Sequence, residues 1–211
     1  MDASDFENLA SKLVGAVGRR YSPREIMPVD LLDKARAMMK RGYVHTPDTL
    51  RVLEAYMQGY GILLSGGLGI GKSFFFEVVN PEPVAVLSFN RCHLWKYDQL
   101  EKWLDDHTGV EVVLDDIGWD ADKANNFGTK YEVLQVVLDH RLTESGCRTH
   151  ITTNLSNDEL VAKYDGHLVD RVYQLCKCFA LPPRQSLREP QPDQIYLKNN
   201  EYARVMGKEV L

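Results

Sequence analysis

The residues whose chemistry is most evident lie in a glycine-rich turn that ends in a lysine and a serine. Gly66, Gly71, Lys72 and Ser73 fit the pattern G-x-x-x-x-G-K-[ST], which is typical of loops that bind phosphate groups. The glycines let successive backbone N–H groups point inward, and the helix after the turn adds the positive end of its dipole. In such a loop, Lys72 would contact the β- and γ-phosphates and the Ser73 hydroxyl would bind Mg²⁺.

The alternative interpretation of this segment is an ordinary glycine turn before a helix. Four matched positions, with the short apolar strand 61–65 before them and an apolar helix after them, favour the phosphate-binding loop. We therefore expect one consecutive run of residues to hold the nucleotide: Gly66, Gly67, Leu68, Gly69, Ile70, Gly71, Lys72, Ser73 and Phe74.

Two aspartates, Asp115 and Asp116, directly follow the apolar run 110–114. In open α/β sheets, ligands bind at the C-terminal ends of the strands. Asp115 would hold Mg²⁺ through its water shell, because Mg²⁺ prefers a few carboxylates together with waters and phosphates. Asp116 would orient or deprotonate the water that attacks the γ-phosphate. The alternative is an acidic cap on the next helix, but a tandem pair beside a phosphate loop favours hydrolysis over a small-molecule kinase, which needs no water-activating carboxylate.

A polar side chain, Asn154, ends another apolar strand at 148–154. Its amide could hydrogen-bond the attacking water or an oxygen of the γ-phosphate. Alternatively, Asn154 caps the helix that begins near Asp158, although Ser156 could provide that cap instead. We favour the functional role for Asn154.

Apolar strands and helices alternate from Tyr60 onward, which predicts an α/β fold with a parallel sheet covered by helices on both faces. The predicted strands are residues 61–65, 84–89, 110–116, 148–154 and 177–181. The predicted helices are residues 72–79, 93–106, 128–144, 158–164 and 168–175. We expect this core to occupy residues 58–183 and to be followed by a polar C-terminal arm over residues 184–211.

The N-terminal region, residues 1–57, is predicted to be helical and carries no catalytic signature. It would form either an adaptor or a cap on the core. Its helices are expected over residues 6–18, from 29 to a stop at Gly42, and over residues 46–57. A basic cluster on the second helix could grip a partner, but a solvated helix face is the favoured interpretation: Lys34, Arg36, Lys40 and Arg41.

Length and composition exclude several classes of protein. At 211 residues and 44% hydrophobic, the chain can bury one core, and a net charge of −5 argues against coating nucleic acid through bulk charge. Apolar runs fall short of the roughly 18 residues of a membrane helix, and the N-terminus lacks a signal-peptide layout. The cysteines show no metal-binding spacing, and Cys176 and Cys178 read as one face of a buried strand, which indicates a reduced, cytoplasmic protein.

Five motifs occur in the order and spacing of the DnaC/IstB-like AAA+ ATPases, a family of bacterial and phage helicase loaders and transposition helper ATPases. These motifs are residues 66–73, 114–118, 139–141, 152–155 and 164–171. The chain resembles this family over roughly residues 43–190. The resemblance implies an AAA+ P-loop NTPase fold with a five-stranded parallel sheet of order 5-1-4-3-2, flanked by helices. A small N-terminal helical region is present, and no C-terminal lid domain is evident.

The resemblance also implies roles for individual residues. It places Walker A at 66–73, Walker B at 114–116 and sensor 1 at Asn154. Arg171 falls where the family carries an arginine finger, which stabilises transition-state charge on a neighbouring subunit's ATP, whereas the residues alone would suggest a solvated arginine. Arg188 is a sensor-2-like candidate, although the family's glycine is missing from its motif. For Arg141, a structural role as the partner of an acidic group on the sheet edge is favoured over a second role in trans.

The function implied by the resemblance is that of a Mg²⁺-dependent ATPase that acts in DNA replication as a helicase loader. ATP would promote assembly of a homo-oligomer, and the partners would be a replicative helicase and single-stranded or duplex DNA. Two alternatives stay open. The first is an IstB-like transposition helper that binds duplex DNA, and the second is a nucleotide-gated scaffold with little turnover.

Overall fold

The structure is a computed structural model that describes residues 27–118, 123–126, 129–143 and 148–183. The predicted first helix, at residues 6–18, the sensor-2 candidate Arg188 and the rest of the predicted C-terminal arm lie outside these residues. None of the helices in the described ranges combines the length and apolar character needed to cross a bilayer.

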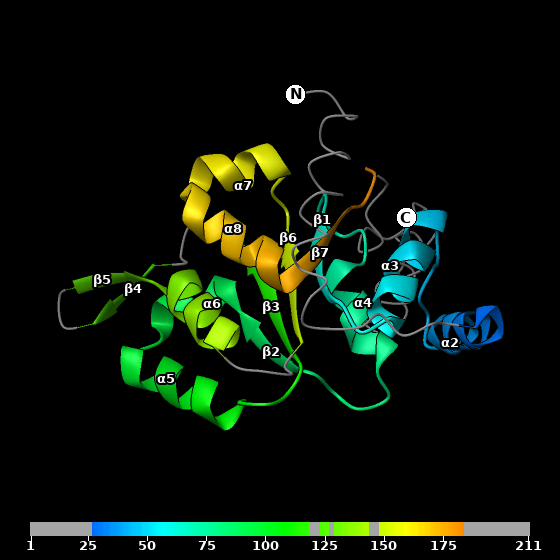
Figure 1. Cartoon of the computed structure of the whole chain (residues 1–211), viewed down its shortest axis with the longest axis horizontal. Helices are drawn as coiled ribbons and strands as arrows, with labels where there is room; N and C mark the ends of the chain where they lie inside the picture. Colours follow the sequence, from blue (N-terminus) through cyan, green and yellow to red (C-terminus); the bar gives the residue numbers. More distant parts are fainter. Residues whose placement is uncertain (1–26, 119–122, 127–128, 144–147, 184–211) are drawn as a thin grey trace, which may run out of the picture.

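A five-stranded parallel sheet forms the centre of the molecule (Figure 1). Its strands are β1 (Gly61–Ser65), β2 (Ala85–Ser88), β3 (Val112–Ile117), β6 (Thr149–Thr153) and β7 (Cys176–Ala180). They lie in the order β2-β3-β6-β1-β7, and every pairing is parallel. When these strands are numbered one to five along the chain, this order is 5-1-4-3-2, so the predicted sheet is confirmed.

Helices cover both faces of this sheet, because alternate residues of its strands point to opposite sides. On one face, Ile62 and Leu64 of β1 share a core with α2 (Pro28–Lys40), α3 (Pro47–Met57) and α4 (Lys72–Val79). On the other face, Leu63 and Ile151 pack with the remaining helices. These are α5 (Tyr97–Asp106), α6 (Val133–Thr143), α7 (Asn157–Lys163) and α8 (Gly166–Leu175).

The described part of the N-terminal region covers one face of the sheet. Gly42 adopts a φ of +89°, in the left-handed region that favours glycine, and it follows the end of α2 as predicted. Thr46 caps α3, since its hydroxyl accepts a hydrogen bond from the Thr49 N–H and Pro47 follows it as the first helical residue. Val52 and Leu53 of α3 are fully buried. The domain boundary between residues 57 and 58 stays a prediction.

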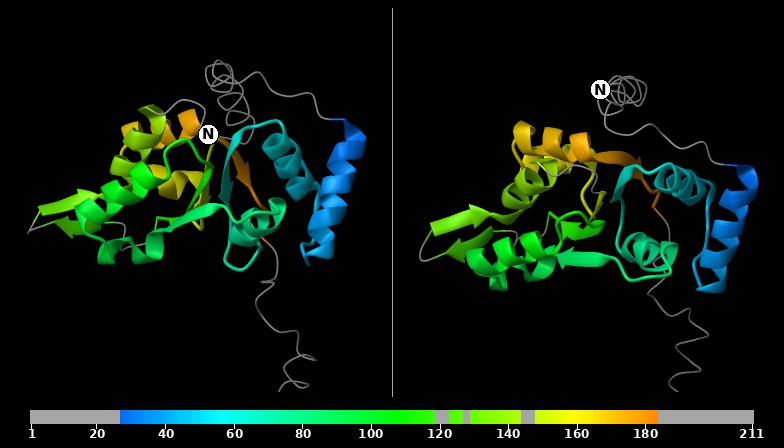
Figure 2. Two further views of the ribbon diagram at one scale, coloured as in Figure 1. Left: turned by 90° about the horizontal axis from the view of Figure 1, so that it is seen from below. Right: turned by 60° about the horizontal axis from the view of Figure 1, so that its bottom comes forward.

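Two predicted helices were wrong in part. The segment predicted as one helix over 93–106 is a 3₁₀ helix, η1 (Phe89–Leu94), followed by α5. The helix predicted over 128–144 begins only at Val133, because an antiparallel hairpin of β4 (Lys123–Asn126) and β5 (Thr129–Glu132) precedes it. Figure 2 shows this hairpin projecting from the body of the protein.

The physical reason for the second error is local. The helical spacing of apolar residues is real within α6, where Leu134, Val137 and Leu138 are buried. It was extended too far towards the N-terminus, over Gly128 and the β-branched Thr129, which are weaker helix formers. The preceding segment supplies a pairing strand there.

Candidate nucleotide-binding site

The glycine-rich loop connects the end of β1 to the start of α4. Gly66, Gly69 and Gly71 have φ values of +142°, +73° and +95°, which side-chain-bearing residues rarely adopt. A Cβ on Gly66 would also lie 2.6 Å from Cδ1 of Ile70 and 2.9 Å from the carbonyl oxygen of Leu181. Glycine is therefore required at position 66 by both backbone conformation and space, and the loop takes the tight path that the motif predicts.

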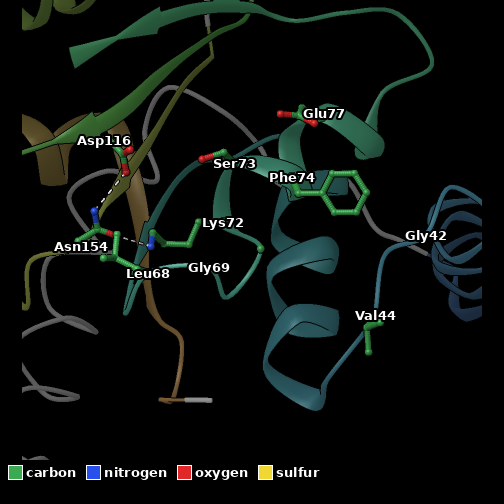
Figure 3. A pocket seen from close by; sticks show the side chains of 11 residues that line it. Gly42, Val44, Leu68, Gly69, Lys72, Ser73, Phe74, Glu77, Asp116 and Asn154 are labelled. Carbon is green, nitrogen blue, oxygen red and sulfur yellow. Dashed lines mark hydrogen bonds between the residues drawn. The ribbon is translucent and has the colours of Figure 1, made fainter. Parts of the chain in front are cut away.

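Lys72 lies across the mouth of this loop. Its ammonium group donates hydrogen bonds to the carbonyl oxygens of Gly66 and Gly67 and to Oδ1 of Asn154, each at 2.8 Å. The residue is only 5% exposed although it carries a charge. The structure thus brings the predicted Lys72 and Asn154 together, from the glycine-rich loop and from the end of β6 (Figure 3).

The predicted metal ligands, Ser73 and Asp115, are also in contact. The Ser73 hydroxyl donates to Oδ1 of Asp115 at 2.6 Å, and the Thr152 hydroxyl donates to the same oxygen at 2.7 Å. One hydroxyl and one carboxylate fit Mg²⁺, which commonly takes few protein ligands and completes its shell with phosphates and waters. The described residues contain no cluster of three or more His, Cys, Asp or Glu side chains that could hold a metal ion.

Asp116 has an unusual backbone conformation. Its φ is +58°, and no other non-glycine residue in the described ranges has a positive φ. The pairing of β3 with β6 shifts register between Leu114 and Ile117, as in a β-bulge, and bulges re-aim side chains next to functional sites. The side chain points towards Asn154, whose Nδ2 lies 3.4 Å from Oδ1 of Asp116 (Figure 3).

Asn154 therefore bridges the lysine and the second aspartate. Its amide oxygen accepts from Lys72 and its amide nitrogen donates to Asp116. The alternative role, as a cap of α7, is filled by Ser156, whose hydroxyl accepts from the N–H of Glu159 at 3.3 Å. The amide of Asn154 is thus directed into the site.

A pocket of about 500 Å³ lies at this edge of the sheet. The residues that line it are Gly42, Val44, Leu68, Gly69, Gly71, Lys72, Ser73, Phe74, Glu77, Asp116 and Asn154. Sequence reasoning missed Gly42, Val44 and Glu77. The only signal for the first two was the glycine turn between two helices, which gives no indication that the turn lies beside the phosphate loop.

The arginine-finger candidate lies apart from this pocket. Arg171, on α8, forms an ion pair with Asp139 of α6 and does not line the pocket. Arg141 is buried at 2% exposure and donates to backbone carbonyls of His107 and Val110 and to the Thr149 hydroxyl. These contacts join α6 to the start of the sheet through backbone carbonyls and a hydroxyl, whereas the structural role favoured for Arg141 was as the partner of an acidic group.

A second polar cluster, which we call the Glu111 cluster, lies at the opposite edge of the same sheet. It consists of Tyr56, Asn80, Glu111, Arg148 and His150. The Tyr56 hydroxyl lies 2.6 Å from Oε1 of Glu111, Nε2 of His150 lies 3.1 Å from the same oxygen, and Arg148 forms an ion pair with the carboxylate. The cluster fastens α3 and the end of α4 to β3 and β6.

Protonation in this cluster follows from burial and partners. Burial lowers the pKa of His150, which accepts a hydrogen bond from the Ile62 N–H at Nδ1 and so carries its proton on Nε2. Burial alone would raise the pKa of the Glu111 carboxyl. The interactions with His150 and Tyr56 and the charge of Arg148 outweigh burial and lower this pKa to about 2.

No protein-family model matches the chain. The replicative helicase loader DnaI of Bacillus subtilis (strain 168) is 28% identical over 145 residues, which are 63% of this chain and 44% of that protein. The chain resembles the DnaC/DnaI-like AAA+ ATPases.

The match leaves much of the relative outside the comparison, since the chain spans less than half of the length of DnaI. Among solved structures, the chain is similar to AMPPCP-bound DnaA from Aquifex aeolicus. That similarity has a TM-score of 0.40 and 10% identity, and it covers 81% of this chain and 56% of that one.

Proposed function

We propose that the chain binds ATP with Mg²⁺ in the pocket beside the phosphate loop and hydrolyses it. The observation that carries the proposal is the contact between Ser73 and Asp115, at 2.6 Å, next to the buried ammonium of Lys72. A hydroxyl and a carboxylate from different elements meet there at the N-terminus of α4, which favours bound phosphate. An ordinary glycine turn would require neither the buried charge nor this pairing.

Each residue then has a role in the reaction. Lys72 would exchange its carbonyl contacts for the β- and γ-phosphates, and Ser73 and Asp115 would hold the cation. Bound Mg²⁺ would supply neutralisation of the charge on the phosphate oxygens. Asp116 would accept the proton of the attacking water, and Asn154, which contacts both Lys72 and Asp116, would keep that carboxylate directed at the phosphate.

The other end of the pocket suits a purine base. Val44 is 55% exposed, and it lines the pocket together with Gly42 and Phe74. A Cβ on Gly42 would lie 3.9 Å from the Phe74 ring, so the turn and the ring lie side by side. Apolar surface next to a phosphate site is what a nucleotide's base requires.

We further propose that Arg171 acts on the nucleotide of a neighbouring subunit. Its ion pair with Asp139 is partly exposed, at 34% and 46% of the two side chains, so exchanging Asp139 for a phosphate has a small cost. An arginine that supplies charge in trans commonly accelerates phosphoryl transfer by about 10³-fold or more. ATP would then be hydrolysed between subunits of a homo-oligomer.

At the level of the cell, the proposal is a cytoplasmic helicase loader in DNA replication, acting on a replicative helicase and on single-stranded or duplex DNA. It is supported by the similarity to DnaI, whose name states that role for that protein. A pull-down of the helicase from the same genome, with and without ATP, tests the partner. Capture that depends on ATP is expected, and binding of duplex DNA without any helicase contact would favour the transposition helper instead.

The enzymatic part is tested by mixing two inactive variants. Lys72→Ala removes the phosphate contact but keeps the finger, and Arg171→Ala does the reverse. Each alone should release phosphate at least about 10²-fold more slowly than the wild type. Mixed together, they should exceed the sum of the separate rates, because an intact nucleotide site meets an intact Arg171 wherever the two variants are neighbours in the oligomer. Hydrolysis by Arg171→Ala alone at the wild-type rate, at high protein concentration, would refute the finger.

A further inference from the structure

A buried hydroxyl, that of Thr152, joins the two aspartates of the site. Thr152 lies on β6, where it pairs with Leu64 of β1, and its side chain is fully buried. Its Oγ1 donates to Oδ1 of Asp115 at 2.7 Å and accepts from the backbone N–H of Asp116 at 2.9 Å. The directions are fixed, since an N–H can only donate and a hydroxyl has one proton to give.

The hydrogen bond from the Asp116 N–H to Thr152 takes the place of a backbone hydrogen bond that β3 and β6 do not form at this residue. Pairing of β3 with β6 is regular up to Leu114 and resumes at Ile117 with a shifted register. Asp116 lies within this break with a φ of +58°. A buried N–H without a partner is costly, so the Thr152 hydroxyl makes the left-handed conformation of Asp116 tolerable.

The second hydrogen bond of the Thr152 hydroxyl holds the carboxylate of Asp115. Oδ1 of Asp115 accepts from both Ser73 and Thr152 in this structure. When the Ser73 oxygen faces a cation, Thr152 still holds the carboxylate in place. One hydroxyl thereby sets the position of the metal-binding group and of the water-activating group at once.

We propose that Thr152 is a positioning residue that couples the metal-binding Asp115 to the water-activating Asp116. This inference rests on the proposed hydrolysis of ATP at the same site. It predicts that loss of the hydroxyl lowers kcat and weakens the affinity for the divalent ion, while affinity for the nucleotide without metal stays the same.

The variant Thr152→Val keeps the shape and strand preference of the side chain and removes only the hydroxyl. We expect its kcat to fall about 10- to 100-fold, with the half-saturating Mg²⁺ concentration raised several-fold and the metal-free ATP affinity within about two-fold of the wild type. Thr152→Ser, which restores the hydroxyl, should recover most of the wild-type rate. If Thr152→Val does not fold, Thr152→Ala carries the same expectation.

The neighbouring Thr153 offers a matched control. Its hydroxyl is equally buried, donates to the carbonyl of Ile117 and accepts from the N–H of Leu155, but touches neither aspartate. Thr153→Val should lower the melting temperature and leave kcat and the half-saturating Mg²⁺ concentration unchanged. Equal kinetic losses in both variants would overturn the assignment to Thr152.

A crystal structure of Thr152→Val separates this inference from the proposed function, because it needs no activity. Asp116 should leave the left-handed conformation and the Asp115 carboxylate should turn away from Ser73. An unchanged Asp115–Asp116 geometry would refute the positioning role even if the wild type hydrolyses ATP. A wild type without ATPase activity, combined with the expected rearrangement, would refute the proposed function and leave the positioning of the two aspartates standing.

Discussion

Acidic residues at the two edges of the sheet have different kinds of partner. At the start of β3, Glu111 is surrounded by donors, among them the cation of Arg148, which makes an ion pair with it. At the end of the same strand, Asp115 accepts from two neutral hydroxyls in the described structure, those of Ser73 and Thr152. A carboxylate paired with a fixed cation is already neutralised, whereas one held by hydroxyls keeps its charge for an ion that arrives with a ligand.

The backbone shows the same contrast. Near Glu111, the strands β3 and β6 pair in regular register, from Val112 opposite Thr149 onward. Near Asp116, the pairing breaks and a non-glycine residue takes a positive φ. Strained residues persist where the surroundings hold them, and they gather at sites that perform chemistry. The difference assigns stability to one edge and reactivity to the other, and the following variants test that assignment.

The largest effect is expected from Asp116→Asn. Asparagine tolerates the left-handed conformation at least as well as aspartate, so the backbone should stay in place while the proposed general base is lost. Phosphate release should fall about 10²- to 10⁴-fold, with nucleotide affinity retained. Steady-state kinetics and a binding titration measure the two quantities. Turnover at the wild-type rate by Asp116→Asn would show that Asp116 is not the general base.

For Glu111→Ala we expect a loss of stability rather than a loss of turnover. Removing the carboxylate leaves the half-buried guanidinium of Arg148 without its ion-pair partner, so the free energy of unfolding should fall by about 3–5 kcal/mol. ATP affinity should stay within about two-fold, because the cluster lies at the far edge of the sheet. Urea unfolding and calorimetry provide the measurements. If Glu111→Ala lost nucleotide binding and kept its stability, the assignment of the Glu111 cluster to stability would be wrong.

Acid should unfold the protein through the same cluster. The pKa of Glu111 is about 2 in the folded chain, against an ordinary value of 4.5. Because the folded value is the lower one, the stabilisation is fully present above about pH 5 and is lost as the pH falls towards 2, to a total of about 3 kcal/mol. Urea midpoints measured from pH 6 to pH 3 should fall less steeply for Glu111→Gln than for the wild type. Parallel slopes would contradict the account.

The smallest effect on stability is expected from Asp139→Asn. The ion pair with Arg171 is partly exposed, so its loss should change the free energy of unfolding by less than about 1 kcal/mol. If the arginine serves a neighbouring subunit, turnover should be kept or raised, because Arg171 is released. A large loss of stability would instead give the pair a structural role.

Sequence reasoning predicted the strand and the helix that flank the glycine-rich loop because the pattern is local. Glycines, a lysine and a serine within one turn carry their meaning in their spacing, and β1 and α4 have the predicted bounds. The sheet order came from family resemblance and is confirmed. The roles assigned to individual site residues stay predictions: Lys72, Ser73, Asp115, Asp116, Asn154, Arg171 and Arg188.

What the sequence did not reveal depends on contacts between distant segments. The Glu111 cluster draws its side chains from different elements that only the fold brings together. Nothing near Asp116 indicated the shifted register, because a bulge is defined by the partner strand. The hairpin before α6 was not predicted, because the helical spacing of apolar residues continues on the N-terminal side of Val133, where α6 begins.

The most direct test of the reactive edge is calorimetric titration of ATP into the wild type and into Lys72→Ala, with and without Mg²⁺. We predict saturable binding by the wild type that tightens when the divalent ion is present, and no measurable binding by a folded Lys72→Ala variant. Absence of heat from the wild type, or equal affinity in both proteins, would contradict the assignment of this edge to a magnesium-bound triphosphate.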